Sequence, residues 1–207
     1  MVPLLALGAT HHRVSDSVWH AGWDRSKRWQ YRKSKTFAPL PLFTYFFPLG
    51  FFNLKDRKDS QGENFWREAQ KAIKMQQAYC KDHGYPKGSF GLSACDGPSG
   101  YTAYAPDNKN PDKTIALLSV LACLPLNERQ VFEWCNYAKQ SDLDRYQYGL
   151  PGAYEPKYGW LEVASDTIGI DIGSTLLMID AYRRGLIHKL SDQNTVIQKA
   201  LQRAGFL

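Results

Sequence analysis

One stretch of the chain, residues 63–82, repeats its apolar side chains every three or four positions. This spacing places them on one face of an amphipathic helix. Gly84 and Pro86 follow directly and are expected to end the helix, because glycine readily adopts the left-handed C-cap conformation and proline cannot continue a helix. The repeating residues are Phe65, Trp66, Ala69, Ala72, Ile73, Gln76, Tyr79 and Cys80.

Similar helical patterns recur along the chain, and no segment alternates β-branched and polar residues as a half-buried strand does. We therefore predict an all-α fold that forms one domain over residues 1–207. Buried helices that alternate with amphipathic ones, joined by long loops, are typical of an α/α toroid. Further helices are predicted at 1–7, 114–124, from Asn127 onward, at 174–184 and at 191–203, the last closed by Gly205.

Helix breakers shape two of these expectations. Gly8 follows the apolar residues 1–7 and is expected to end that helix in the left-handed conformation. Residues 37–52 are apolar, but three prolines and Gly50 interrupt them. These breakers exclude an uninterrupted helix or a membrane span, so the segment is expected to be buried and kinked.

The N-terminal segment, MVPLLALGAT, is too short to cross a bilayer and lacks the basic region of a signal peptide. We interpret it as the end of a buried helix. The net charge of +6 is concentrated nearby, since residues 1–40 hold seven Lys/Arg against two Asp. A basic segment such as 13–35 can track nucleic-acid phosphates, but a solvated helix face has the same composition.

The sequence predicts neither a metal site nor a cofactor site. The four cysteines contain no C-x-x-C pair, and we interpret them as buried thiols. His11 and His12 are adjacent, which is poor geometry for joint ligation, and the other histidines are scattered.

Two stretches set an acid among glycines, GLSACDGPSGYTAY at 91–104 and GIDIG at 169–173. Glycine and proline break regular structure, so both stretches are predicted to be loops that expose polar groups. Asp96, flanked by Tyr101 and Tyr104, is a candidate site. Each acid also has a structural interpretation, with Asp96 as a turn former and Asp171 as a helix N-cap.

A third aromatic and glycine-rich loop covers residues 146–160 and precedes Asp166. Aromatic residues make up 14% of the chain, which is high and indicates either a surface for flat ligands such as sugars or bases, or a large core. If the chain is a glycosidase, four aromatic side chains are expected to stack on or bond to sugar rings: Tyr101, Tyr104, Tyr148 and Trp160.

Collinear blocks over nearly the whole chain resemble the C-terminal half of the glycoamylase-like (putative glucoamylase) family, which includes endo-β-1,2-glucanases and domains of cyclic β-glucan synthases. The most specific blocks are GLSACDGPSGYTAYAP and IGIDIGSTLLMIDAYRRGLI, and others are PLFTYFF, RYQYGL and QKALQRAGF. The resemblance implies that this chain forms about half of an (α/α)6 toroid, as the C-terminal portion of that barrel. It also implies a periplasmic or secreted location.

The resemblance further implies a glycoside hydrolase-like protein that acts on or binds a β-glucan, with β-1,2-glucan favoured. Hydrolysis of a glycosidic bond generally needs two carboxyl groups. By resemblance Asp171 is the general base, Asp96 lies in the substrate cleft and Asp166 contacts the substrate. The glutamate expected as general acid would fall before Met1, so catalysis itself is left open.

An alternative is a non-catalytic carbohydrate-binding remnant, because Ile172 stands where the family usually has a glutamine. The expected partner is an oligosaccharide or polysaccharide in either case, and binding of nucleic acid by the basic segment ranks third. Half a toroid would also expose helix faces that a homodimer could cover.

Overall fold

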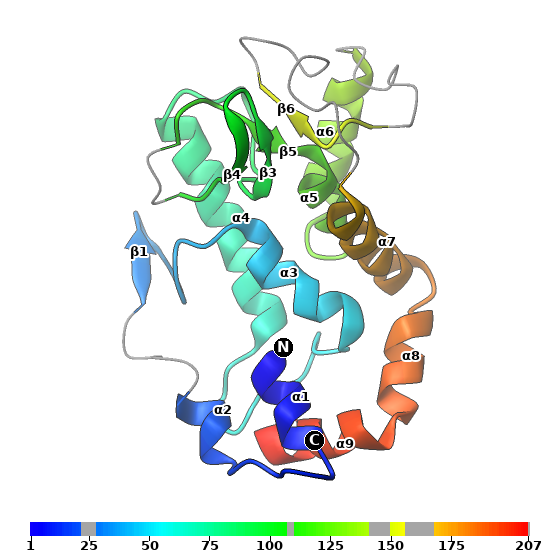
Figure 1. Cartoon of the computed structure of the whole chain (residues 1–207). Coiled ribbons are helices and arrows are strands. Elements are labelled where there is room, and N and C mark those ends of the chain that lie inside the picture. Colours follow the sequence, from blue (N-terminus) through cyan, green and yellow to red (C-terminus); the bar gives the residue numbers. More distant parts are fainter. Residues whose placement is uncertain (22–27, 107–109, 141–149, 156–167, 207) are drawn as a thin grey trace.

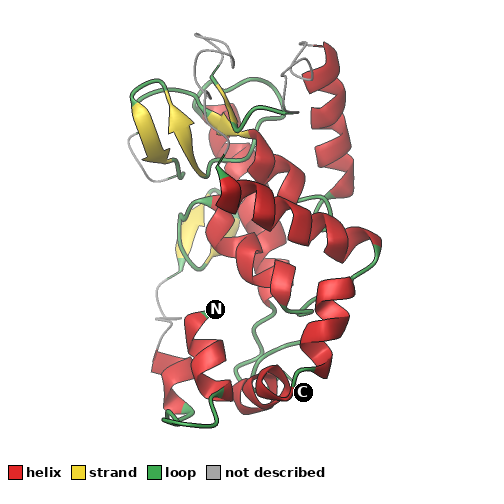
Figure 2. Ribbon diagram, turned by 45° about the vertical axis from the view of Figure 1, so that its right-hand side comes forward, coloured by secondary structure: helices red, strands yellow, loops and turns green. Residues whose placement is uncertain are grey.

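The computed structural model describes residues 1–21, 28–106, 110–140, 150–155 and 168–206, and these residues are mostly helical (Figure 1). Short antiparallel strand pairs accompany the helices at the margin of the molecule (Figure 2). The helices are α1 (Val2–Gly8), α2 (Ser17–Ala21), α3 (Leu42–Phe51), α4 (Phe65–Asp82), α5 (Leu117–Ala122), α6 (Glu128–Gln140), α7 (Gly169–Arg183), α8 (Leu186–Gln193) and α9 (Thr195–Ala204). The strands are β1 (Trp29–Tyr31), β2 (Ser34–Thr36), β3 (Ala94–Gly97), β4 (Gly100–Ala103), β5 (Ile115–Ala116) and β6 (Ala153–Tyr154).

Helix α4 confirms the prediction made from the three-and-four spacing. Asn64 caps it, because its side-chain oxygen accepts the Arg67 N–H at 2.8 Å. Gly84 follows the C-cap with a φ of +70°, in the left-handed region. The apolar face is buried, and Ile73 and Cys80 on it are fully inaccessible to solvent.

Gly8 has a different role from the one predicted. It lies inside α1, and its φ is not in the left-handed region. A Cβ at this position would come within 2.2 Å of the Val196 carbonyl oxygen in α9. Glycine is needed here because α1 and α9 pack backbone to backbone, a requirement that local sequence does not reveal.

Pro48 and Gly50 lie inside α3, whereas the sequence predicted that they would break the segment. Pro48 removes one backbone N–H, and Thr44, whose carbonyl would accept it, is exposed to solvent. A Cβ at Gly50 would lie 2.9 Å from the Leu177 Cβ, so the glycine permits close packing of α3 on α7. Tertiary packing therefore outweighs the low helix propensity of these two residues.

The predicted helix over 114–124 is partly wrong. Residues 115–116 form β5, which pairs with β6. The Ala116 N–H donates to the Gly91 carbonyl at 3.0 Å, and not to a carbonyl of the same helix. Helix α5 supplies the rest and is buried as predicted. The segment 191–203 contains two helices, since Asn194 ends α8 and caps α9, whereas Gly205 ends α9 with a φ of +83° as predicted.

Several apolar side chains of the described residues face solvent. Val2 and Leu5 on α1 are 75% and 42% exposed, and Leu176, Leu186 and Leu190 on α7 and α8 are 54–60% exposed. The homodimer expected from such faces stays a prediction, which light scattering of the purified chain would test. No helix within the described ranges is long and apolar enough to cross a membrane.

Candidate functional site

Asp96 lies on a β-hairpin and not in the irregular loop that its glycines predicted. In the β3–β4 pairing Asp96 stands directly opposite Tyr101, and Gly97 opposite Gly100. Side chains of directly opposed residues project from the same face of a hairpin. Asp96 is half-buried and Tyr101 is 58% exposed, so the carboxyl group and an accessible aromatic ring share that face.

Asp171 lies in the first turn of α7, where the helix begins after Ile168. It is therefore not the N-cap of the structural interpretation, nor a loop residue. Its side chain is only 7% exposed. The unpaired backbone N–H groups of a first turn favour a negative charge, but burial of this side chain opposes the charge more strongly and raises its pKa.

Hydroxyl groups fix the turn that carries Asp171. Ser174 Oγ and Thr175 Oγ1 lie 3.1 and 2.7 Å from the Asp171 carbonyl oxygen. Thr175 Oγ1 also lies 2.9 Å from the Leu118 carbonyl oxygen in α5. The start of α7 is thereby joined to α5, which Figure 1 shows at the same end of the molecule as the β3–β4 hairpin.

The two acids lie within electrostatic range of each other. Burial raises the pKa of Asp171 to about 6, and the charge of Asp96 adds to the rise. Burial also raises the pKa of Tyr101, with further contributions from Asp171 and Asp96. The same two carboxylates raise the pKa of the Cys95 thiol, again after burial. Asp96, Asp171, Cys95 and Tyr101 therefore share one electrostatic neighbourhood.

This arrangement suits acid–base chemistry. A buried carboxylate with a raised pKa is a stronger base than an ordinary aspartate, yet it is mostly ionised at pH 7. Asp96 is a second carboxyl group in a more exposed environment. Two carboxyl groups in such different environments can take separate acid and base roles. Among the described residues, no group of three or more His, Cys, Asp or Glu could hold a metal ion.

Tyr104 does not fit the sugar-stacking role predicted for it. Its ring is fully buried, and its hydroxyl donates to Asp112 Oδ2 at 3.0 Å. It follows the last residue of β4 and lies in the core. Its hydroxyl packs against Gly97 of β3, where a Cβ would come within 1.9 Å of it. Tyr148, Trp160 and Asp166 lie outside the described residues.

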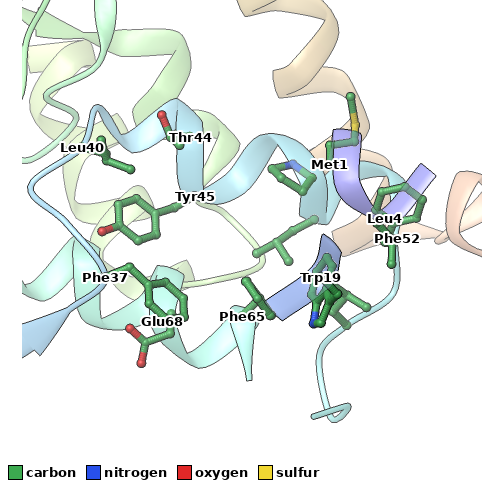
Figure 3. Close-up of a pocket in the computed structure, with 13 residues that line it drawn as sticks. Met1, Leu4, Trp19, Phe37, Leu40, Thr44, Tyr45, Phe52, Phe65 and Glu68 are labelled. Atoms are coloured by element: carbon green, nitrogen blue, oxygen red, sulfur yellow. The ribbon is translucent and has the colours of Figure 1, made fainter. Parts of the chain in front are cut away.

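An apolar pocket lies between α1, α2, α3 and α4 (Figure 3). Its walls include Trp19, Phe37 and Phe65, and neither Asp96 nor Asp171 lines it. The Glu68 carboxylate in its wall pairs with Lys71 at 2.6 Å and with Arg28 at 3.2 Å. These two cations account for the buried charge of Glu68.

Asp171 should lower the stability of the folded chain at neutral pH. Its folded pKa of about 6 lies above the ordinary 3.8, so between these values the folded state binds more protons than the unfolded state and stability falls as pH rises. Asp171→Asn, neutral at every pH, should therefore be more stable than wild type at pH 7 by about 1–2 kcal/mol, after allowance for screening by nearby water. Urea unfolding of both proteins between pH 4 and 7 would measure this, and a constant difference over that range would contradict it.

The family described as putative glucoamylase matches residues 1–195, nearly the whole chain. The chain belongs to the putative glucoamylase family. A putative glucoamylase from Bacteroides uniformis superposes with a TM-score of 0.86 at 26% identity, over 100% of this chain and 53% of that one.

Two further relatives have names that state their substrates. An endo-β-1,2-glucanase from Chitinophaga pinensis, solved with sophorotriose and glucose, has a TM-score of 0.84 at 22% identity, over 99% of this chain and 53% of that chain. An exo β-1,2-glucooligosaccharide sophorohydrolase from Parabacteroides distasonis is 26% identical over 147 residues, which are 68% of this chain and 20% of that protein. This putative glucoamylase family member thus spans about half the length of the solved relatives, and the matched region is a fifth of the curated one.

Sequence reasoning missed three residues around the acids: Gln76, Cys95 and Thr175. Gln76 did leave a signal, because it is a polar residue in the apolar row of α4, and the structure buries it. Thr175 and Cys95 left none, since the contact of Thr175 depends on how α7 packs on α5 and that of Cys95 on where the β3–β4 hairpin lies.

Proposed function

We propose that this chain is a glycoside hydrolase-like protein that acts on β-1,2-glucan, with Asp171 as general base and Asp96 beside it in the substrate cleft. The observation that carries the proposal is the buried carboxyl group of Asp171, whose pKa is raised to about 6 by burial and by Asp96. The names of the relatives from Chitinophaga pinensis and Parabacteroides distasonis favour β-1,2-linked glucose as the substrate.

In this proposal Asp171 accepts a proton from the attacking water, and the glutamate that the resemblance implies as general acid gives a proton to the leaving oxygen. The exposed ring of Tyr101 packs against a sugar ring. Tyr101 suits this role because it is accessible and shares the face of the hairpin that carries Asp96. Tyr148, Trp160 and Asp166 remain proposed substrate contacts. We also propose that residues 1–207 form the C-terminal portion of an (α/α)6 toroid, consistent with their 53% coverage of the solved relatives.

The test is release of reducing ends from linear β-1,2-glucan by the purified full chain. We expect release from β-1,2-glucan and none from β-1,3- or β-1,4-linked glucans under the same conditions. A folded chain that releases no reducing ends from β-1,2-glucan would contradict the catalytic proposal.

The exposed ring of Tyr101 also supports a second candidate, a carbohydrate-binding protein without catalysis. In that case calorimetry should detect binding of β-1,2-gluco-oligosaccharides without their hydrolysis, and Tyr101→Ala should weaken it.

Nucleic-acid binding ranks below both, because Arg28 and Arg32 of the basic segment already pair with Glu63 and Asp82.

A further inference from the structure

A buried glutamine holds the stretch of chain that leads to Asp96. Gln76 is on α4 and is 1% exposed. Its Oε1 accepts the backbone N–H groups of Gly91 at 3.0 Å and Leu92 at 2.8 Å, and its Nε2 donates to the Leu92 carbonyl at 2.8 Å. The side-chain amide therefore bonds to residues 91 and 92 as a neighbouring strand would.

The same short segment is anchored from two other sides. The Leu42 N–H donates to the Leu92 carbonyl at 2.8 Å, and the Phe43 N–H donates to Ser93 Oγ at 3.1 Å. From β5, the Ala116 N–H donates to the Gly91 carbonyl. Strand β3 begins at the next residue, so the position of Asp96 follows from the position of residues 91–93.

The two carboxyl groups thus reach the site on separately anchored elements. Asp171 is tied to α5 through Thr175, whereas Asp96 is tied to α4 through Gln76. We propose that Gln76 is a positioning residue, which acts through residues 91–93 to hold the Asp96 carboxylate beside Asp171. This inference deepens the proposed function, but the placement of the two acids can be measured without any hydrolysis.

The test replaces Gln76 by methionine, which has similar length and volume but cannot form the three hydrogen bonds. Without them the buried N–H groups of Gly91 and Leu92 lose their acceptor, so the segment should shift toward other partners. The readout is the pKa of Asp171, followed by NMR of its carboxyl carbon during a pH titration. Asp96, whose charge adds to the rise in the pKa of Asp171, is chemically unchanged in the variant.

The expected result in Gln76→Met is a fall in the pKa of Asp171 from about 6 toward its ordinary 3.8. Both causes of the rise, burial and the charge of Asp96, weaken when the hairpin moves away. The matched control is Gln77→Met, the same chemical change one residue along α4. Gln77 Nε2 donates instead to Gln130 Oε1 at 2.6 Å, so this variant should leave the pKa of Asp171 unchanged.

A folded Gln76→Met protein in which Asp171 keeps the wild-type pKa would overturn the proposal. An equal shift in Gln77→Met would also overturn it. If Gln76→Met does not fold, hydrogen exchange of the wild-type chain decides, because the Gly91 and Leu92 amides should exchange as slowly as those in the middle of α4. Fast exchange of those two amides would show that Gln76 does not hold residues 91 and 92. If the wild-type chain releases no reducing ends but Gln76→Met still lowers the pKa of Asp171, only the proposed function is contradicted.

Discussion

Replacement of Asp171 by asparagine is expected to lower the rate of β-1,2-glucan hydrolysis by about 10²–10⁴-fold, the usual contribution of a general base. Asparagine has nearly the same shape, so the fold should persist, but its amide cannot take a proton from water. The rate of the wild-type chain should rise with pH through about 6, where Asp171 loses its proton. Initial rates of reducing-end release between pH 4 and 8 measure both effects.

The control for this experiment is Asp56→Asn, the same change at an exposed position in the segment between α3 and α4. It should leave the rate unaltered. Equal rates in wild type and Asp171→Asn would remove Asp171 from the mechanism. Loss of activity in both variants would point to a general effect of the substitutions.

Replacement of Gly91 by alanine is expected to destabilise the fold by about 4 kcal/mol or more, a value that needs a specific structural cause. Gly91 has a φ of +101°, which an L residue rarely adopts. A Cβ here would lie 2.5 Å from Val120 Cγ2 and 3.2 Å from the Ala116 carbonyl oxygen. Relief of that clash would displace the segment that Gln76 holds and disturb the position of Asp96 as well. Urea unfolding at constant pH measures the loss.

Gly100→Ala separates backbone strain from steric clash. Gly100 has nearly the same φ, +104°, but a Cβ there would have no heavy atom within 4 Å. Strain alone should cost about 1–3 kcal/mol, so Gly100→Ala should be clearly the milder variant. Equal losses of stability in the two proteins would show that packing against Val120 and Ala116 is unimportant.

The sequence was sufficient to predict the features that short-range patterns determine. Helix α4 followed from its apolar spacing, and the end of α9 followed from Gly205. The candidate acids also stood out locally, because glycines and aromatic residues surround Asp96 and the resemblance singled out Asp171. What these local patterns could not supply was the secondary structure that the two acids occupy.

Where prediction failed, a contact between distant segments decides the local structure. The β3–β4 hairpin forms on a segment anchored by α3, α4 and β5. Tyr104 is buried, and its hydroxyl donates to Asp112 outside the hairpin. Gly8 is required by Val196, far away in the sequence. Spacing and propensity describe a segment by itself, so they carry no information about such partners.

The assignment of the two acids to different elements has a consequence for synthesis of the protein. Asp96 leaves the ribosome on the β3–β4 hairpin, whereas Asp171 emerges only with α7, after α5 and α6 have been translated. Because contacts between distant segments form late, the Asp96 carboxylate comes near Asp171 only after α7 docks on α5. A polypeptide truncated before α7 would therefore retain Gln76 and the hairpin, but it would lack the buried member of the acid pair.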